Sequence, residues 1–239
     1  MKESGIYEQL GVAMTCRSFD EYAAMFQLTE KELSAGPILD VAAGGSSFAA
    51  GATVAGYEAF AIDPRYQGDS SAWIQEAARE IVTSTEKLAS IQDRFDWSYY
   101  GSLDQHRDGR EASLLQFQTD LQSISAQKTK RYINGRLPSL PLPDNRYGLV
   151  LCSHFLFLYA EQFAYDFHLA SIRELLRVCK PGGQVRIYPL LSLRWEPYDR
   201  LEELIEALQG EGKAETAIQT TGLPFIPGSI HYLNLLKKG

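Results

Sequence analysis

The sequence predicts an α/β protein whose mostly parallel sheet is covered by helices on both faces. Strand-like and helix-like segments alternate from residue 38 onward, which is typical of such sheets. The unbroken apolar run YGLVLCS, at residues 147–153, is typical of a central parallel strand. The chain has 239 residues and 45% hydrophobic content, enough to bury one sizeable core. We therefore expect a single domain over residues 1–239.

Residues 1–37 are predicted to form an N-terminal helical arm. Ser18 and Glu21 have the spacing of a capping box before FDEYAAMF, and Thr29 and Glu32 have it before EKEL. The Gly-Pro pair at residues 36–37 ends the arm.

A strand, a glycine loop, a helix and a second strand follow one another over residues 37–63. The strands are PILDVAA and EAFAID, and the helix between them covers residues 47–55. Such a loop is expected to present free backbone N–H groups at the carboxyl edge of the sheet, where open α/β sheets bind ligands.

Residues 69–130 interrupt the alternation and are predicted to be a helical insertion. Apolar residues recur at helical spacing within residues 73–91 and again within residues 111–124. Between these helices lie four aromatic residues, namely Phe95, Trp97, Tyr99 and Tyr100. They are expected either to form a lid over a bound molecule or to pack the insertion onto the sheet.

The alternation resumes after the insertion and completes a sheet of seven strands. Further strands are expected at residues 131–135, 147–153, 184–190, 214–221 and 229–238. Helices are expected at residues 163–179 and 197–209, and KPGG turns the chain from the first of them into the next strand.

Composition narrows the class of partner. The net charge is −7 and no long basic run occurs, which disfavours a nucleic-acid partner and favours a small molecule. No window approaches the roughly 20 apolar residues of a membrane span, and the start has no signal-peptide core, so a cytoplasmic protein without a membrane contact is expected. Cys16, Cys152 and Cys179 lack the spacing of a disulfide framework or a metal site and are predicted to be small buried residues.

The glycine loop does not match the dinucleotide fingerprint G-x-G-x-x-G. Counting from Gly44, the positions that need glycine hold Ser46 and Ala49. A nicotinamide or flavin cofactor, and with it an NAD-dependent oxidoreductase, is therefore disfavoured.

Three motifs resemble the class I S-adenosylmethionine-dependent methyltransferases. They are DVAAGGS with an acid at the end of the next strand, LPLPDNRYGLVLCSHFLFLY, and ELLRVCKPGGQVRIYPL with its PGG turn. The resemblance implies a seven-stranded, doubly wound sheet whose last strand is antiparallel. It also implies S-adenosylmethionine as cofactor and, for this chain, an unidentified small-molecule acceptor.

The same resemblance assigns the site residue by residue. It implies that Asp40, Ala42 and Gly44 hold the methionine part of the cofactor and that Asp63 binds the ribose hydroxyls. The other cofactor-binding residues expected from it are Ser46, Pro64, Arg136, Leu137 and Ser153.

Two of these residues depart from the family pattern. Ser46 replaces a glycine, and Arg136 stands where an acid meets the adenine amino group, which a guanidinium cannot do because it only donates. The departures keep open the alternative of a non-catalytic protein that binds S-adenosylmethionine or S-adenosylhomocysteine and regulates another process.

His154 is the candidate catalytic residue. Methyl transfer from a sulfonium requires alignment of donor and acceptor, and a base only where the acceptor atom carries a proton of high pKa. His154 follows the strand at residues 147–153 and can titrate near neutrality, so it can serve as that base. The alternative is a histidine that lines the cofactor pocket without taking a proton. Tyr188, Arg194 and Trp195 are expected near the same cleft.

Overall fold

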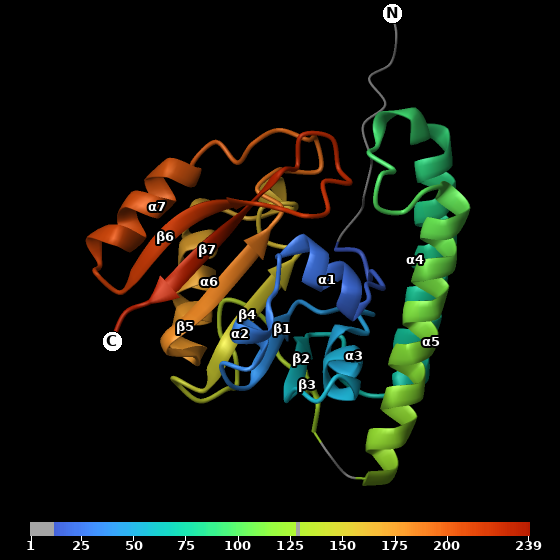
Figure 1. Ribbon diagram of the computed structural model, residues 1–239, viewed down its shortest axis with the longest axis horizontal. Helices are drawn as coiled ribbons and strands as arrows, with labels where there is room; N and C mark the ends of the chain where they lie inside the picture. The colour runs from blue at the N-terminus through green and yellow to red at the C-terminus, as the bar shows by residue number, and fades with distance from the viewer. Residues whose placement is uncertain (1–11, 128–129) are drawn as a thin grey trace, which may run out of the picture.

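The computed structural model describes residues 12–127 and 130–239 and contains one seven-stranded sheet in the order β3-β2-β1-β4-β5-β7-β6 (Figure 1). The first five strands in the chain run parallel, whereas β7 is antiparallel to both of its neighbours. This confirms the predicted fold class. The strands are β1 (Ile38–Val41), β2 (Ala59–Asp63), β3 (Tyr132–Asn134), β4 (Tyr147–Ser153), β5 (Cys179–Tyr188), β6 (Ala214–Thr220) and β7 (His231–Lys237).

Helices cover both faces of the sheet. They are α1 (Phe19–Met25), α2 (Glu30–Leu33), α3 (Phe48–Val54), α4 (Ser70–Ser90), α5 (Leu103–Gln127), α6 (Tyr165–Val178) and α7 (Leu201–Gly210), with short 3-10 turns η1 (Gln92–Arg94) and η2 (Ala160–Gln162). Successive strand residues face opposite sides, so Ile38 packs with α1, α3, α4 and α5, while Leu39 packs with α6 and α7. Among the described residues, no helix has the length and apolar character needed to cross a membrane.

The N-terminal arm has the predicted helices. Both capping boxes form, Ser18 with Glu21 and Thr29 with Glu32. Residues 1–11 of the predicted arm lie outside the described residues. Residues 12–17, which we call the strap, lead into α1 and lie beside the glycine loop, where Gly45 donates its N–H to the carbonyl of Thr15 at 3.1 Å.

The insertion is a hairpin of two long helices, α4 and α5, which lie side by side next to α3 (Figure 1). The helix expected from residue 111 in fact begins at Leu103, so that boundary was wrong. The hydroxyl of Ser102 accepts the N–H of Gln105 at 3.2 Å and caps the helix. A serine followed three residues later by glutamine is the sequence signal that indicates this start.

The loop ahead of β5 also differs from expectation. KPGG was predicted as a turn before the strand, but β5 begins at Cys179 and includes it. The pairing with β4 shifts register there, since Tyr147 faces Cys179 while Leu149 faces Gln184. The glycines therefore form an irregularity at the start of the strand.

All three cysteines are buried, which confirms that they are small core residues.

Candidate functional site

Two cavities lie at the carboxyl edge of the sheet. One, which we call the Asp63 cavity, is lined at the ends of β1 and β2 by Val41, Ala42, Asp63, Pro64 and Arg65, after β3 by Gly135, Arg136 and Leu137, and elsewhere by Val12, Phe155, Phe163 and Phe167. The second, the His154 cavity, is lined by the strap residues Ala13 to Arg17, by residues of α4 and α5, and by the loops that follow β4, β5 and β6.

The strap lies between the cavities, since Val12 lines one and Ala13 lines the other. Its position is set by two hydrogen bonds at this point. Ala13 donates its N–H to the hydroxyl of Tyr159 at 2.9 Å, and the guanidinium of Arg65 donates to the carbonyl of Val12. The strap therefore forms a shared wall of both cavities.

The glycine loop does not present the free N–H groups that its sequence predicts. Gly44 donates to Asp63 Oδ2 at 3.0 Å, Gly45 donates to Thr15, and Ser47 donates to the carbonyl of Arg17 at 3.0 Å. The expectation was wrong because strap and loop are far apart in sequence and their contact forms only in the folded chain. Ser46 turns its hydroxyl to the carbonyl of Arg17, at 3.1 Å.

Asp63 is held at the end of β2 with both carboxylate oxygens engaged. Oδ2 accepts from Gly44, and Oδ1 accepts the N–H of Arg65 at 2.9 Å. Burial raises the pKa of Asp63, against the lowering by these backbone bonds and by the Arg65 guanidinium. A carboxylate has about four lone-pair sites, so Asp63 retains acceptor capacity toward the cavity that it lines.

Asp40 lies deeper than the resemblance implies. It is fully buried within β1 and lines neither cavity. Its Oδ1 accepts from the hydroxyl of Tyr22 at 3.0 Å, and Oδ2 has no partner among the described residues. Burial raises the pKa of Asp40 to about 8. The side chain therefore carries a proton over much of the neutral range.

The Asp63 cavity brings together Ala42, Asp63, Pro64, Arg136 and Leu137 from the predicted set. It also contains an aromatic group that was not predicted, in which Phe163 and Phe167 stack with ring centroids 4.3 Å apart and Phe155 lies against both. Gly44, Ser46 and Ser153 lie nearby in the chain but do not line it. The aromatic-rich stretch after β4 is the signal that points to this group.

His154 lines the second cavity and contacts Ser153 through Nδ1. The hydroxyl oxygen of Ser153 lies 3.4 Å from Met25 Sδ and 2.8 Å from His154 Nδ1. The hydroxyl hydrogen of Ser153 can go to either partner, so in the neutral ring the lone pair lies on Nδ1 when Ser153 donates to it and on Nε2 when Nδ1 donates to Ser153. Burial, and then the charges of Arg17 and Arg110, lower the pKa of His154 well below its usual range. His154 is therefore neutral at pH 7, with one ring nitrogen unprotonated, and the same surroundings make it a weak base.

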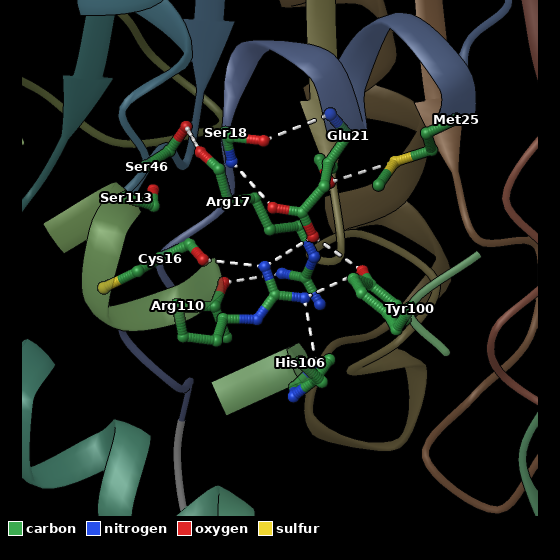
Figure 2. A network of polar contacts seen from close by, with 12 residues as sticks. Cys16, Arg17, Ser18, Glu21, Met25, Ser46, Tyr100, His106, Arg110 and Ser113 are labelled. Carbon is green, nitrogen blue, oxygen red and sulfur yellow. Dashed lines mark hydrogen bonds and ion pairs between the residues drawn. The ribbon is translucent and has the colours of Figure 1, made fainter. Parts of the chain in front are cut away.

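A buried polar network joins the arm to the insertion (Figure 2). Arg110 of α5 pairs with Glu21 of α1 at 2.5 Å and donates to the hydroxyl of Tyr100 at 2.9 Å and to the carbonyl of Cys16 at 2.7 Å. Burial favours a raised pKa for Glu21, but Arg110 and Arg17 outweigh it and lower the pKa to about 2. His106 Nε2 lies 3.1 Å from Arg110 and completes the network.

The tip of the insertion closes one side of the His154 cavity. Phe95 stacks on Phe225 at 4.8 Å and meets Trp195 edge-on at 5.5 Å, and all three line the cavity. Trp97 and Tyr100 also pack against Phe225 but lie behind this lining. Tyr99 is 40% exposed.

The two other residues expected near the cleft lie outside the lining. Tyr188 is buried and donates its hydroxyl to the carbonyl of Leu223 at 3.1 Å. Arg194 forms an exposed ion pair with Glu161.

Comparison with known proteins agrees with the sheet topology. A family model described as "Methyltransferase domain" matches residues 105–187, which include β3, β4 and most of β5 but not the glycine loop. The uncharacterized protein MJ0045 of Methanocaldococcus jannaschii is 33% identical over 214 residues, which are 89% of this chain and 90% of that protein.

Two solved structures with a similar course of the chain are methyltransferases of low sequence identity. Magnesium protoporphyrin IX methyltransferase of Synechocystis, solved with bound S-adenosylmethionine, has a TM-score of 0.47 at 12% identity, covering 92% of this chain and 78% of that one. The 1,6-didemethyltoxoflavin-N1-methyltransferase of Burkholderia thailandensis has a TM-score of 0.45 at 15% identity, covering 85% and 71%. The matched domain and the strand order are consistent with the class I S-adenosylmethionine-dependent methyltransferase family.

Proposed function

We propose that this protein transfers a methyl group from S-adenosylmethionine to a small-molecule acceptor. The observation that carries the proposal is the pair of cavities on either side of the strap, one containing the acid at the end of β2 and the other the histidine after β4. These are the positions at which an open α/β sheet binds ligands.

The Asp63 cavity fits the adenosine part of the cofactor. Asp63 can accept from two ribose hydroxyls while it keeps its backbone bonds. Phe163, Phe167 and Leu137 offer flat apolar surface to a purine ring. Arg136 lies in the same lining and can donate to ring nitrogens, whereas it cannot accept from the exocyclic amine.

The glycine loop fits the remainder of the cofactor less directly. Its N–H groups at Gly44, Gly45 and Ser47 are already bonded within the chain. The methionine part is therefore held by other groups.

The His154 cavity is where we place the acceptor. Bound S-adenosylmethionine would supply a methyl group on a positively charged sulfur. As the acceptor atom bonds to the methyl carbon, the bond from sulfur to that carbon breaks and S-adenosylhomocysteine is left. Phe95, Trp195 and Phe225 give this cavity an apolar wall. Where the acceptor atom carries a proton, the unprotonated ring nitrogen of His154 accepts it.

A transfer assay tests this function and separates it from non-catalytic binding. The full chain is incubated with radiolabelled S-adenosylmethionine and a panel of small metabolites, and label in the organic products is counted. The expected result is incorporation into at least one compound, with kcat about a hundredfold lower in His154→Gln at similar KM. Tight binding of S-adenosylhomocysteine without incorporation into any compound would favour the non-catalytic alternative.

A further inference from the structure

The guanidinium of Arg17 lines the His154 cavity without an acidic partner. Among the described residues it donates one side-chain hydrogen bond, from Nη1 to Thr15 Oγ1 at 2.7 Å, and no carboxylate oxygen lies within 4.0 Å of it. Burial, and then the charge of Arg110, lower the pKa of Arg17. An arginine nevertheless stays protonated in proteins. The cavity wall therefore has a positive charge that a bound anion would stabilise.

His106 supplies a second unpaired donor in the same cavity. Arg110 only donates, so His106 Nε2 accepts from it across 3.1 Å. Burial and Arg110 lower the pKa of His106 to about 3, so the ring is neutral and its single hydrogen lies on Nδ1. This Nδ1 is buried and has no partner among the described residues. It is a donor without an acceptor, on a residue of the cavity lining.

The other charges around the cavity leave an excess of positive charge. Glu21 is one carboxylate facing two guanidinium groups, since it forms a 2.5 Å ion pair with Arg110 and attracts Arg17 only at longer range. Glu80 of α4 is the acid in the lining, and burial raises its pKa, which favours its neutral form. The lining therefore attracts an anion more than a cation.

Most of the rest of the lining is apolar, with both aromatic and aliphatic side chains. Phe95, Trp195 and Phe225 come from three separate segments of the chain, and the aliphatic members are Ile81, Leu88, Leu158, Leu193 and Ile226. Flat apolar ligands pack well against such walls.

We infer that the acceptor is a flat, apolar carboxylic acid whose carboxylate is bound by Arg17 and His106 while its ring lies against Phe95, Trp195 and Phe225. This inference rests on the proposed function in that it names the class of molecule that the His154 cavity takes. A planar guanidinium suits a carboxylate because it offers two parallel N–H bonds.

The test compares acids with their uncharged amides. Benzoate against benzamide and salicylate against salicylamide are titrated by calorimetry into the full chain saturated with S-adenosylhomocysteine. The carboxylates are expected to bind about tenfold or more tightly than the amides, because charge-assisted hydrogen bonds are stronger than neutral ones. Arg17→Gln should abolish this preference, and Arg17→Lys should retain part of it.

Two further variants make the outcome specific. His106→Leu keeps the charge of Arg17 and should weaken the carboxylates severalfold while leaving the amides unchanged. Arg107→Gln is the matched control, since Arg107 also lies on α5 but forms exposed ion pairs with Asp104 and Glu111. It should bind all four compounds as the wild type does. Circular dichroism and thermal unfolding check that each variant folds. If Arg17→Gln does not fold, the carboxylate affinity of His106→Leu tests the inference.

Three results would overturn the inference: amides that bind as tightly as acids, no binding of either acid, or a carboxylate preference that survives Arg17→Gln. A loss of S-adenosylhomocysteine affinity in Arg17→Gln with an intact carboxylate preference would assign Arg17 to the cofactor instead. Failure of the wild type to bind S-adenosylhomocysteine would contradict the proposed function alone, because the carboxylate preference can still be measured on the unliganded chain.

Discussion

Gly44 donates its backbone N–H to the Oδ2 of Asp63 at 3.0 Å, which ties the glycine loop after β1 to the end of β2. Gly44 has φ +57°, a conformation that glycine adopts without strain. The hydroxyl of Tyr66 also donates to the carbonyl of Gly44, at 2.7 Å. The acid and the loop are therefore one rigid unit, and a change in either is expected to disturb the other.

The raised pKa of Asp40 predicts a specific pH dependence of stability. Its pKa is 3.8 when unfolded and about 8 when folded, so the folded chain holds the proton more tightly between these values. The stabilisation is complete below pH 3.8 and is lost as the pH rises through about 8, at up to about 1.4 kcal/mol per pH unit. Urea unfolding from pH 5 to 9 should show this loss in the wild type and a smaller one in Asp40→Asn. Parallel curves for the two proteins would show that Asp40 ionises normally.

The ion pair between Glu21 and Arg110 is expected to hold the arm against the insertion. Glu21→Gln leaves a buried guanidinium without a counter-ion and should cost about 3–5 kcal/mol of unfolding free energy. A double variant, Glu21→Gln with Arg110→Met, should recover part of that loss because it removes the uncompensated charge. Denaturant unfolding measures both variants. A double variant less stable than Glu21→Gln would contradict this explanation.

The pair of Glu21 and Arg110 is also expected to make the stability of the fold depend on pH below about 4.5. The pKa of Glu21 is about 2 in the folded chain against 4.5 unfolded, so its stabilisation is present above pH 4.5 and lost as the pH falls through about 2.

The contact between Phe95 and Phe225 is expected to hold the hairpin tip over the His154 cavity. Asp96 also donates its N–H to the carbonyl of Phe225 at 3.2 Å. Phe225→Ala removes the stacked ring and should raise the rate of hydrogen exchange at residues 94–101, because the free energy of local opening is then lower. Residues 112–124 of α5 serve as the internal control and should exchange as before. Unchanged exchange at the tip would mean that it stays closed without the ring.

Much of the fold and part of the site follow from local sequence patterns. The capping boxes at Ser18 and Thr29 and the alternation of strands and helices are short-range signals, and they hold in the structure. Asp63 and Leu137 meet in one cavity because the carboxyl ends of parallel strands lie at one edge of the sheet. That rule places residues without any knowledge of side-chain packing.

The remaining site residues depend on contacts that no local pattern contains. Arg17 lies at the glycine loop only because the strap folds back on Gly45 and Ser47. His106 and Arg110 reach the arm only because the insertion packs beside α1, and the spacing of a helix does not indicate which element it will contact. The prediction of free N–H groups at the glycine loop was wrong because the strap accepts hydrogen bonds from Gly45 and Ser47.

Titration of S-adenosylhomocysteine into the wild-type chain and into Asp63→Asn, with NAD as the negative control, tests most directly whether the carboxyl edge of this sheet binds the cofactor. Asparagine has nearly the shape of aspartate but lacks its charge, so the ribose hydroxyls lose charge-assisted acceptors. The wild type should bind S-adenosylhomocysteine and not NAD, and Asp63→Asn should bind it about thirtyfold more weakly, equivalent to about 2 kcal/mol. Equal affinity in the two proteins, or no binding to the wild type, would contradict the assignment of Asp63 and of the cavity that it lines.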